Sequence, residues 1–289
     1  MYLFNKYFTF IIQKKIVFLF CYFSLFVNLT KIIKMLRFNF TLILTIILLV
    51  SCKQNYSHNS TSQELIKISD SIAIDKSIEE FIKPYRDSLE AEISVIIGKN
   101  REEMRSYKPE SPLSSFVADI ILSRGLEFLK ENGVADADIP SIAVMNVRGL
   151  RTSLKPGDII VRDIFEVMPF ENNLTALYLS GEDIEHLFEH IAKANGDGLA
   201  GATCSLTSDG MKDIKIAGKP LDKEKHYWVF APDYLANGGD SYFILQNSSK
   251  VFESNYKIRD LIIAHIKQQS SKGIEIMPDL STRITDKRK

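Results

Sequence analysis

The sequence predicts an α+β domain over residues 76–285, in which a mixed β-sheet packs with helices. Four segments place apolar residues on one face with a period near 3.6, which is typical of amphipathic helices. Short apolar runs of strand length lie between them, and turn signals such as Asp209-Gly210 join several of these runs as hairpins. Helices mixed with hairpin-connected strands indicate an α+β domain rather than a purely parallel sheet.

The expected elements follow in chain order. The helices cover residues 75–98, 114–129, 184–194 and 259–267. We expect the first helix to kink or to start again at Pro84 and to end at Gly98 as a cap. The expected strands cover residues 141–145, 174–179, 203–207, 211–216 and 227–232. The tail, residues 286–289, is expected to be loose.

Composition limits the classes of function. The 289 residues include 36 basic and 36 acidic side chains and carry a formal net charge of +0. Proteins that bind nucleic acid usually carry a basic surplus, so no nucleic-acid partner is expected. The three cysteines, Cys21, Cys52 and Cys204, are too few and too scattered for a disulfide framework or a four-ligand zinc site.

The N-terminal region is typical of an export signal. Residues 35–52 begin with a basic Arg37, continue with an apolar core and end in Leu49-Val50-Ser51-Cys52. This ending resembles a bacterial lipobox, in which the cysteine is lipidated and becomes the first residue of the mature protein. We therefore expect Cys52 to anchor the protein by lipid in the cell envelope, in the periplasm or on the outer surface. The alternative is a membrane anchor, but the run is shorter than the ~20 residues that span a bilayer.

Residues 1–34 contain a further apolar run, Ile16 to Val27, upstream of this signal. We interpret Met35 as the true start and residues 1–34 as upstream sequence translated by mistake; the alternative is a genuine extra membrane segment. Residues 53–75 are polar and rich in turn-forming residues, which suits a tether between a lipid and a folded domain.

Residues 143–175 are the most informative stretch. An apolar run stops at Asn146, and Arg148-Gly149-Leu150-Arg151 then places two guanidinium groups beside a glycine, where the backbone can turn or approach a ligand closely. After a turn at Lys155-Pro156-Gly157-Asp158, a second element ends at Met168-Pro169-Phe170. Two arginines, an asparagine and an aromatic ring on neighbouring loop ends suit an anionic ligand with a flat ring.

Three motifs resemble a known family in order and spacing. They are Asn146-Val147-Arg148-Gly149-Leu150-Arg151, Pro169-Phe170-Glu171-Asn172 and Tyr234-Leu235-Ala236-Asn237-Gly238-Gly239-Asp240-Ser241-Tyr242. Together they resemble the C-terminal domain of the 5′-nucleotidases, a family that includes periplasmic UDP-sugar hydrolases and surface ecto-5′-nucleotidases. The resemblance runs from about Ile82 to about Leu245.

The resemblance implies a nucleotide site. Phe170 and Tyr234 match the two positions at which family members stack a nucleobase, an interaction of roughly 1–3 kcal/mol per base. The alternative is that both are ordinary core aromatics. Asp240, after Gly238 and Gly239, matches the carboxylate that receives a ribose hydroxyl; the alternative is a turn aspartate that caps its own backbone.

The resemblance also implies contacts to phosphate. Arg151 matches an arginine directed toward substrate, and arginine binds phosphate through bidentate hydrogen bonds; the alternative is a surface salt bridge. Arg148 stands where the family has glycine, and it either adds a phosphate contact or, as we prefer, is a surface arginine. Asn146, Gly149 and Asn172 complete the expected substrate-binding set.

The sequence departs from the family pattern at several positions. The family's arginine upstream of the second helix corresponds to a position near Tyr107, with Arg105 and Lys108 only nearby. Glu171 replaces a glycine and adds negative charge close to the expected base site. On the third predicted helix, His186 and His190 have the spacing of metal ligands, but they lie opposite its apolar face, so we expect a solvated face.

Family enzymes carry a separate N-terminal metallophosphoesterase domain, whose two metals generate the nucleophile and neutralise the phosphoryl group. None of the five histidines here lies in a motif that would hold those metals. We therefore expect no catalytic residue, metal ligand or cofactor in this chain, and divalent metals on a separate metallophosphoesterase chain. The expected ligand is an AMP-like nucleotide or a UDP-sugar. The alternatives are a stand-alone nucleotide- or nucleoside-binding lipoprotein and a structural remnant with a decayed site.

Overall fold

The computed structural model describes residues 34–43, 69, 72–134, 136–137 and 139–288. The chain divides into two compact units, residues 1–73 and residues 74–289. In the first unit, residues 34–43 are helical, while Cys52 and most of the predicted signal and tether lie outside the described residues. Within the described ranges, no helix has both the length and the apolar character needed to cross a membrane.

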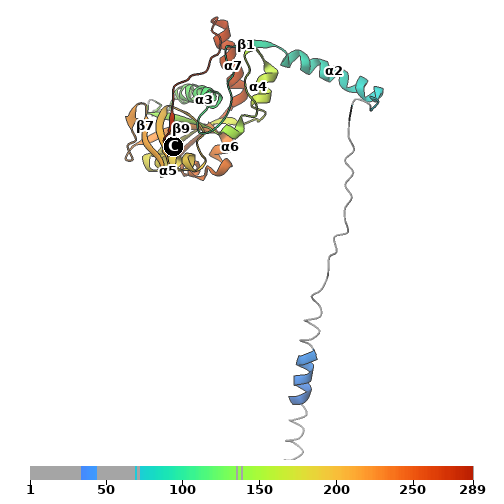
Figure 1. The fold of residues 1–289 in the computed structure, drawn as a ribbon, viewed down its shortest axis with the longest axis vertical. Coiled ribbons are helices and arrows are strands. Elements are labelled where there is room, and N and C mark those ends of the chain that lie inside the picture. The colour runs from blue at the N-terminus through green and yellow to red at the C-terminus, as the bar shows by residue number, and fades with distance from the viewer. Residues whose placement is uncertain (1–33, 44–68, 70–71, 135, 138, 289) are drawn as a thin grey trace, which may run out of the picture. The chain divides into compact units, whose positions relative to one another are not determined.

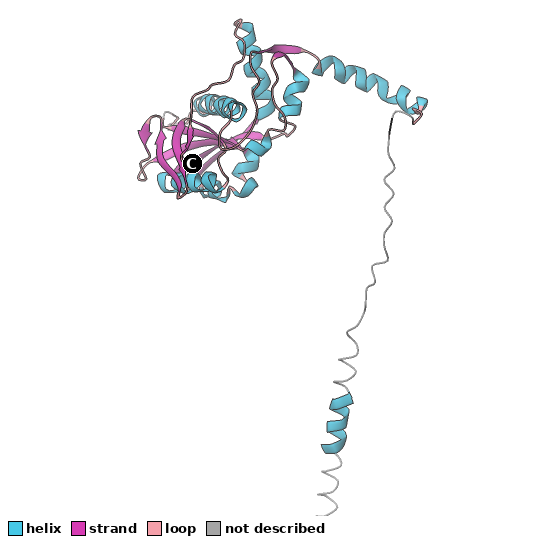
Figure 2. Cartoon of the chain, viewed as in Figure 1, coloured by secondary structure: helices cyan, strands magenta, loops and turns pink. Residues whose placement is uncertain are grey.

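The second unit is built around a five-stranded mixed sheet with the order β10-β4-β9-β2-β5 (Figures 1 and 2). Its strands are Lys250–Lys257 (β10), Asn173–Ser180 (β4), His226–Pro232 (β9), Ser141–Met145 (β2) and Gly198–Ala200 (β5). The neighbours β2 and β9 are parallel, and every other neighbouring pair in this sheet is antiparallel. The loops that follow β2 and β9 therefore leave the sheet at the same edge.

Helices cover both faces of this sheet, so the side chains of β2 are buried on both sides. Ala143 and Met145 pack with helix α3 (Pro112–Glu131), whereas Ile142 and Val144 pack with α5 (Gly181–Lys193) on the other face. Successive side chains of a strand point to opposite faces, so a strand covered on both sides is a continuous apolar run. The helix α7 (Ile258–Ser271) lies beside α3 (Figure 1).

Two smaller sheets complete the strands. A four-stranded sheet has the order β11-β6-β7-β8, with the strands Ile284–Asp286, Ala202–Thr207, Gly210–Ile216 and Lys219–Pro220, and its β7 contacts α5. A two-stranded sheet pairs β1 (Ile96–Asn100) with β3 (Gly157–Ile160). The remaining helical segments are Lys76–Ile93 (α2), Val161–Val167 (α4), Asp233–Ala236 (α6), Val147–Gly149 (η1), Gly239–Ser241 (η2) and Phe243–Asn247 (η3). The predicted α+β fold with a mixed sheet is confirmed.

The first predicted helix forms, but its end differs from the prediction. α2 runs through Pro84 and ends at Ile93, and Gly98 lies in β1 instead of capping a helix. A Cβ atom on Gly98 would lie 2.6 Å from Cγ2 of Ile266. Glycine at this position therefore permits the close approach of α7 to β1, a tertiary contact that the local pattern did not reveal.

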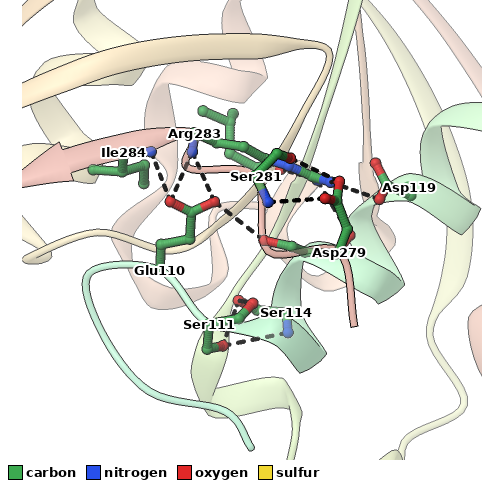
Figure 3. Close-up of polar contacts among 10 residues, drawn as sticks. Glu110, Ser111, Ser114, Asp119, Asp279, Ser281, Arg283 and Ile284 are labelled. Carbon is green, nitrogen blue, oxygen red and sulfur yellow. Dashed lines mark hydrogen bonds and ion pairs between the residues drawn. The ribbon is translucent and has the colours of Figure 1, made fainter. Parts of the chain in front are cut away.

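The prediction of a loose tail over residues 286–289 is wrong for its first two residues. Asp286 ends β11, which pairs with β6 in parallel, and the N–H of Lys287 bonds to the carbonyl of Leu206. The carboxylate of Glu110 accepts the backbone N–H groups of Arg283 and of the following residue, each at 2.8 Å (Figure 3). The buried guanidinium of Arg283 donates to Asp119 at 2.7 Å and to Asp279 at 3.0 Å. We call these four residues, Glu110, Asp119, Asp279 and Arg283, the tail clasp.

Candidate functional site

A pocket of about 570 Å³ lies at the sheet edge where the loops after β2 and β9 meet. It is lined by Asn146, Arg148, Gly149, Arg151, Phe170, Asn172, Tyr234 and Asp240. All of these lining residues were selected from the sequence. The two other expected residues do not line the pocket: Gly239 lies against Tyr234, and Gly238 lies against Phe243.

The loop after β2 supplies one side of the pocket. Asn146 leads into η1, and the exposed Arg148 within this turn and Arg151 just after it both line the pocket. A Cβ atom on Gly149 would lie 2.6 Å from Cε of Met145 and 2.9 Å from Oδ1 of Asn146. Glycine at this position therefore lets the turn pack closely against the side chains of Met145 and Asn146, which a larger residue would displace.

Asp240, from the loop after α6, is held by two other pocket residues. Its carboxylate accepts a hydrogen bond from Nδ2 of Asn146 at 2.7 Å and one from the hydroxyl of Tyr234 at 3.1 Å. The turn-cap alternative therefore does not describe this side chain. Each carboxylate oxygen has a second lone pair that can accept a ligand hydroxyl.

The backbone at Asp240 is strained. Asp240 has a φ of 48° and Ser241 a φ of 66°, both in the left-handed region. A residue with a side chain loses about 1–2 kcal/mol in this conformation. Such strain persists where surrounding contacts impose it, and it concentrates at ligand sites.

Two glycines allow the position of Tyr234. A Cβ atom on Gly239 would lie 2.5 Å from Cζ of the Tyr234 ring, and Gly238 has a φ of +88°, which glycine adopts without strain. The Tyr234 side chain is 45% exposed. It is therefore not a core aromatic, and its ring is accessible to a ligand in the pocket.

Phe170 and Arg151 contact each other across the pocket wall. The guanidinium carbon of Arg151 lies 4.9 Å from the centroid of the half-buried Phe170 ring, within the range of a cation–π contact. In the part of the chain that the structure describes, neither Arg148 nor Arg151 forms an ion pair with a carboxylate. Among the described residues, Arg151 thus contacts the Phe170 ring and not a carboxylate, and both guanidinium groups lie at the pocket.

Glu171 does not bring its charge into the pocket. Its carboxylate lies 2.7 Å from Nζ of Lys257 and 3.1 Å from Nη2 of Arg259, and these two cations, Lys257 foremost, lower the pKa of Glu171. Arg259 also lies over the Phe165 ring at 4.0 Å. The expected negative charge beside the base site is therefore neutralised by cations of β10 and α7.

The two histidines of α5 have different environments. His186 is exposed and lies 3.2 Å from Glu189, as expected for a solvated face. The prediction is wrong for His190, because its ring packs against Tyr242 at 4.2 Å and burial lowers its pKa. Across the described ranges, no three His, Cys, Asp or Glu side chains are grouped so that they could hold a metal ion.

The segment that corresponds to the family's upstream arginine supplies nothing to this pocket. Tyr107 lines a different hollow near the tail clasp, and Nζ of Lys108 lies 3.5 Å from a carboxylate oxygen of Asp197 behind the pocket. Asp197 was not selected from the sequence, although it is 3% exposed and bonded to both pocket loops. The only sequence signal for it is the Asn195-Gly196 pair before it, a common helix ending.

Comparison with known proteins places the motifs in one family. The family model described as the 5′-nucleotidase C-terminal domain matches residues 90–247, which is more than half of the chain. Protein UshA of Yersinia enterocolitica is 28% identical over 199 residues, covering 67% of this chain and 34% of that protein. The 5′-nucleotidase of Vibrio parahaemolyticus is 25% identical over 203 residues, with the same two coverages. The chain thus spans about a third of the length of these curated relatives.

Solved structures show the same fold. A 5′-nucleotidase precursor from Thermus thermophilus superposes with a TM-score of 0.60 at 20% identity, over 73% of this chain and 43% of that one. The NAD nucleotidase of Haemophilus influenzae superposes with a TM-score of 0.56 at 16% identity, over 74% and 42%. The matched segment contains all three motifs and every residue that lines the pocket. The chain belongs to the family of the 5′-nucleotidase C-terminal domain.

Proposed function

We propose that this chain is the nucleotide-recognition part of a 5′-nucleotidase-type phosphohydrolase system. The observation that carries the proposal is the combination of groups in one pocket. Phe170 and Tyr234 offer rings for a flat base, Arg151 and Arg148 offer guanidinium groups for phosphate, and Asp240 offers a fixed carboxylate for ribose hydroxyls. AMP and a UDP-sugar each contain a base, a ribose and phosphate.

We further propose that a separately encoded metallophosphoesterase chain performs the hydrolysis. Two bound metals would supply the hydroxide nucleophile and charge neutralisation on that partner. This chain would hold the base and the ribose and thereby orient the phosphate toward the partner. The proposal is supported by the five histidines of the printed sequence, none of which lies in a dimetal motif.

Calorimetric titration of the full chain with adenosine, AMP and UDP-glucose tests the recognition function. We expect saturable binding of AMP that is tighter than binding of adenosine and that is weakened in Phe170→Ala and in Asp240→Ala. Absence of heat with all three ligands at millimolar concentration, in protein shown to be folded, would contradict it. Adding the partner chain and measuring phosphate release from AMP then tests whether the partner performs the hydrolysis.

The cell-envelope location is a separate proposal, which rests on the signal-like residues 35–52 and their lipobox-like ending at Cys52. Labelling of the expressed protein with an alkyne-tagged fatty acid tests it. We expect the label on the wild type, no label on Cys52→Ala, and release of that variant from the membrane fraction. Equal labelling of both proteins would rule out Cys52 as the anchor.

A further inference from the structure

Asp197 lies behind the pocket, between the two loops that form it. One carboxylate oxygen accepts the backbone N–H of Val147 at 2.9 Å, and the other accepts the hydroxyl of Tyr242 at 2.7 Å. Val147 directly follows Asn146, and Tyr242 lies two positions after Asp240. A single buried side chain therefore joins the loop after β2 to the loop after β9.

The end of α5 sets the position of Asp197. The N–H of Gly196 bonds to the carbonyl of Ile191, and the N–H of Asn195 bonds to the carbonyl of the residue after Ile191. Asn195 has a φ of 67°. This pattern is the Schellman motif, which ends a helix and fixes the direction of the next residues. Asp197 is the first side chain after it.

Two glycines bring the backbone around Asp197 close to its neighbours. A Cβ atom on Gly196 would lie 2.1 Å from the carbonyl oxygen of Pro109, and one on Gly198 would lie 2.7 Å from the carbonyl oxygen of Ser114. Because neither flanking residue has a side chain, the segment fits tightly between these two backbones. The position of the Asp197 carboxylate is therefore determined by rigid parts of the fold.

The charge of Asp197 has a nearby cation. Nζ of Lys108 lies 3.5 Å from the carboxylate and also donates to the carbonyl of Ala194. Hydrogen bonds to a charged acceptor are roughly twice as strong as those between neutral groups. The ring of His190 packs against Tyr242 and covers that side of the network. The carboxylate is thus buried, charge-balanced and bonded at both oxygens.

We propose that Asp197 is a positioning residue of the nucleotide site, which sets the separation of the loops that carry Asn146 and Asp240. This role rests on the function proposed for the pocket. Asp197 does not line the pocket. It holds Val147 and Tyr242 in one hydrogen-bonded unit. This unit in turn maintains the hydrogen bond between Asn146 and Asp240 and the left-handed backbone at Asp240.

The test compares AMP binding by the full chain carrying Asp197→Ala, Tyr242→Phe or both changes. We expect each single change to weaken binding about tenfold, a free-energy difference of about 1.4 kcal/mol. Both changes remove the same hydrogen bond, between Asp197 and Tyr242. The double variant should therefore have about the same affinity for AMP as the single variant that binds AMP less tightly. Asp197→Asn keeps an acceptor for the Val147 amide and should recover part of the affinity.

A matched control separates positioning from general loss of stability. Nε1 of Trp228 donates to the carbonyl of Asp136 at 2.9 Å, at the end of β9 opposite the pocket. Trp228→Phe removes this bond and core volume, so it should lower the melting temperature and leave the affinity for AMP unchanged. Equal weakening of AMP binding in Trp228→Phe and Tyr242→Phe would assign both effects to stability and overturn the proposal.

Hydrogen exchange in the ligand-free protein distinguishes failure of this inference from failure of the proposed function. We expect the Val147 amide to exchange faster in Asp197→Ala and the β2 amides to keep their protection. If the wild type binds no nucleotide, the pocket's function fails, while faster exchange at Val147 still supports the link between the loops. Unchanged Val147 exchange or wild-type affinity in folded Asp197→Ala overturns the inference. If Asp197→Ala does not fold, an affinity of Tyr242→Phe for AMP equal to that of the wild type overturns the inference.

Discussion

The side-chain amide of Asn146 donates to a carboxylate oxygen of Asp240 at 2.7 Å, although 94 positions separate the two residues in the sequence. Asn146 directly follows β2, and Asp240 follows the short helix after β9. The parallel pairing of β2 and β9 places these chain ends side by side. Ligands of α/β sheets commonly bind at the carboxyl ends of parallel strands, and this small parallel pair has the same geometry.

The aromatic rings of Phe170 and Tyr234 should strengthen AMP binding by stacking on the base. We expect Phe170→Ala and Tyr234→Ala each to weaken AMP binding by roughly 1–3 kcal/mol, measured by calorimetry. Phe243→Ala is the matched control, because Phe243 is 65% exposed and does not line the pocket. The same loss in Phe243→Ala would show that the effect does not come from stacking in the pocket.

Arg151 should distinguish AMP from adenosine. Removing its charge in Arg151→Ala should weaken AMP binding by about 1.5–3 kcal/mol, the range for a hydrogen bond to a charged group. Adenosine has no phosphate, so its binding should change less, through loss of the contact between Arg151 and Phe170 alone. Arg101→Ala, which changes an exposed arginine beside Glu275, should affect neither ligand. Equal losses for AMP and adenosine in Arg151→Ala would remove the phosphate role.

The tail clasp should stabilise the fold without affecting the pocket. Glu110→Gln weakens the acceptor for the backbone N–H groups at Arg283 and Ile284, so we expect a loss of about 1–2 kcal/mol in the free energy of unfolding. Urea titration measures this loss. Glu275→Gln, which removes exposed ion pairs to Lys99 and Arg101, should change stability by less than about 1 kcal/mol. A larger loss from Glu275→Gln than from Glu110→Gln would contradict the clasp.

Cys204 should make stability depend on alkaline pH. Burial, with the nearby charge of Glu110, raises the pKa of the Cys204 thiol to about 12. In the unfolded chain the thiol ionises at about pH 8.5, so above that pH the unfolded state binds fewer protons than the folded state and stability falls. The stability advantage of the wild type over Cys204→Ala should shrink by up to about 1.4 kcal/mol per pH unit between about pH 9 and pH 11. An advantage that stays constant over this range would show that the folded thiol ionises normally.

Buried strands and helices, and turns marked by residues such as glycine and proline, could be predicted from the sequence. All five residues of β2 are buried, and the predicted bounds, residues 141–145 around an apolar run, are correct. The strand β10 was missed, because only Ser254 among its eight residues is buried and an edge strand of this kind lacks the apolar pattern. The three-residue β11 was missed for a different reason: its position depends on the distant Glu110 and not on local pattern.

The candidate site was predictable to the extent that its residues lie in contiguous motifs. The loops that carry Arg148, Arg151 and Tyr234 have glycines and charges that can be recognised in the sequence. His190 and Asp197 could not be placed in this way. Their surroundings come from Tyr242, which reaches α5 and the segment after it only when the loop after β9 folds back.

The most direct test of nucleotide recognition compares AMP with 2′,3′-dideoxy-AMP in titrations of the wild type and Asp240→Asn. If the carboxylate of Asp240 receives the ribose hydroxyls, Asp240→Asn should weaken AMP binding by about 1.5–3 kcal/mol and leave dideoxy-AMP binding nearly unchanged. The wild type should also bind AMP more tightly than dideoxy-AMP. Equal affinity of the wild type for both ligands, or no binding of either, would contradict ribose recognition in this pocket.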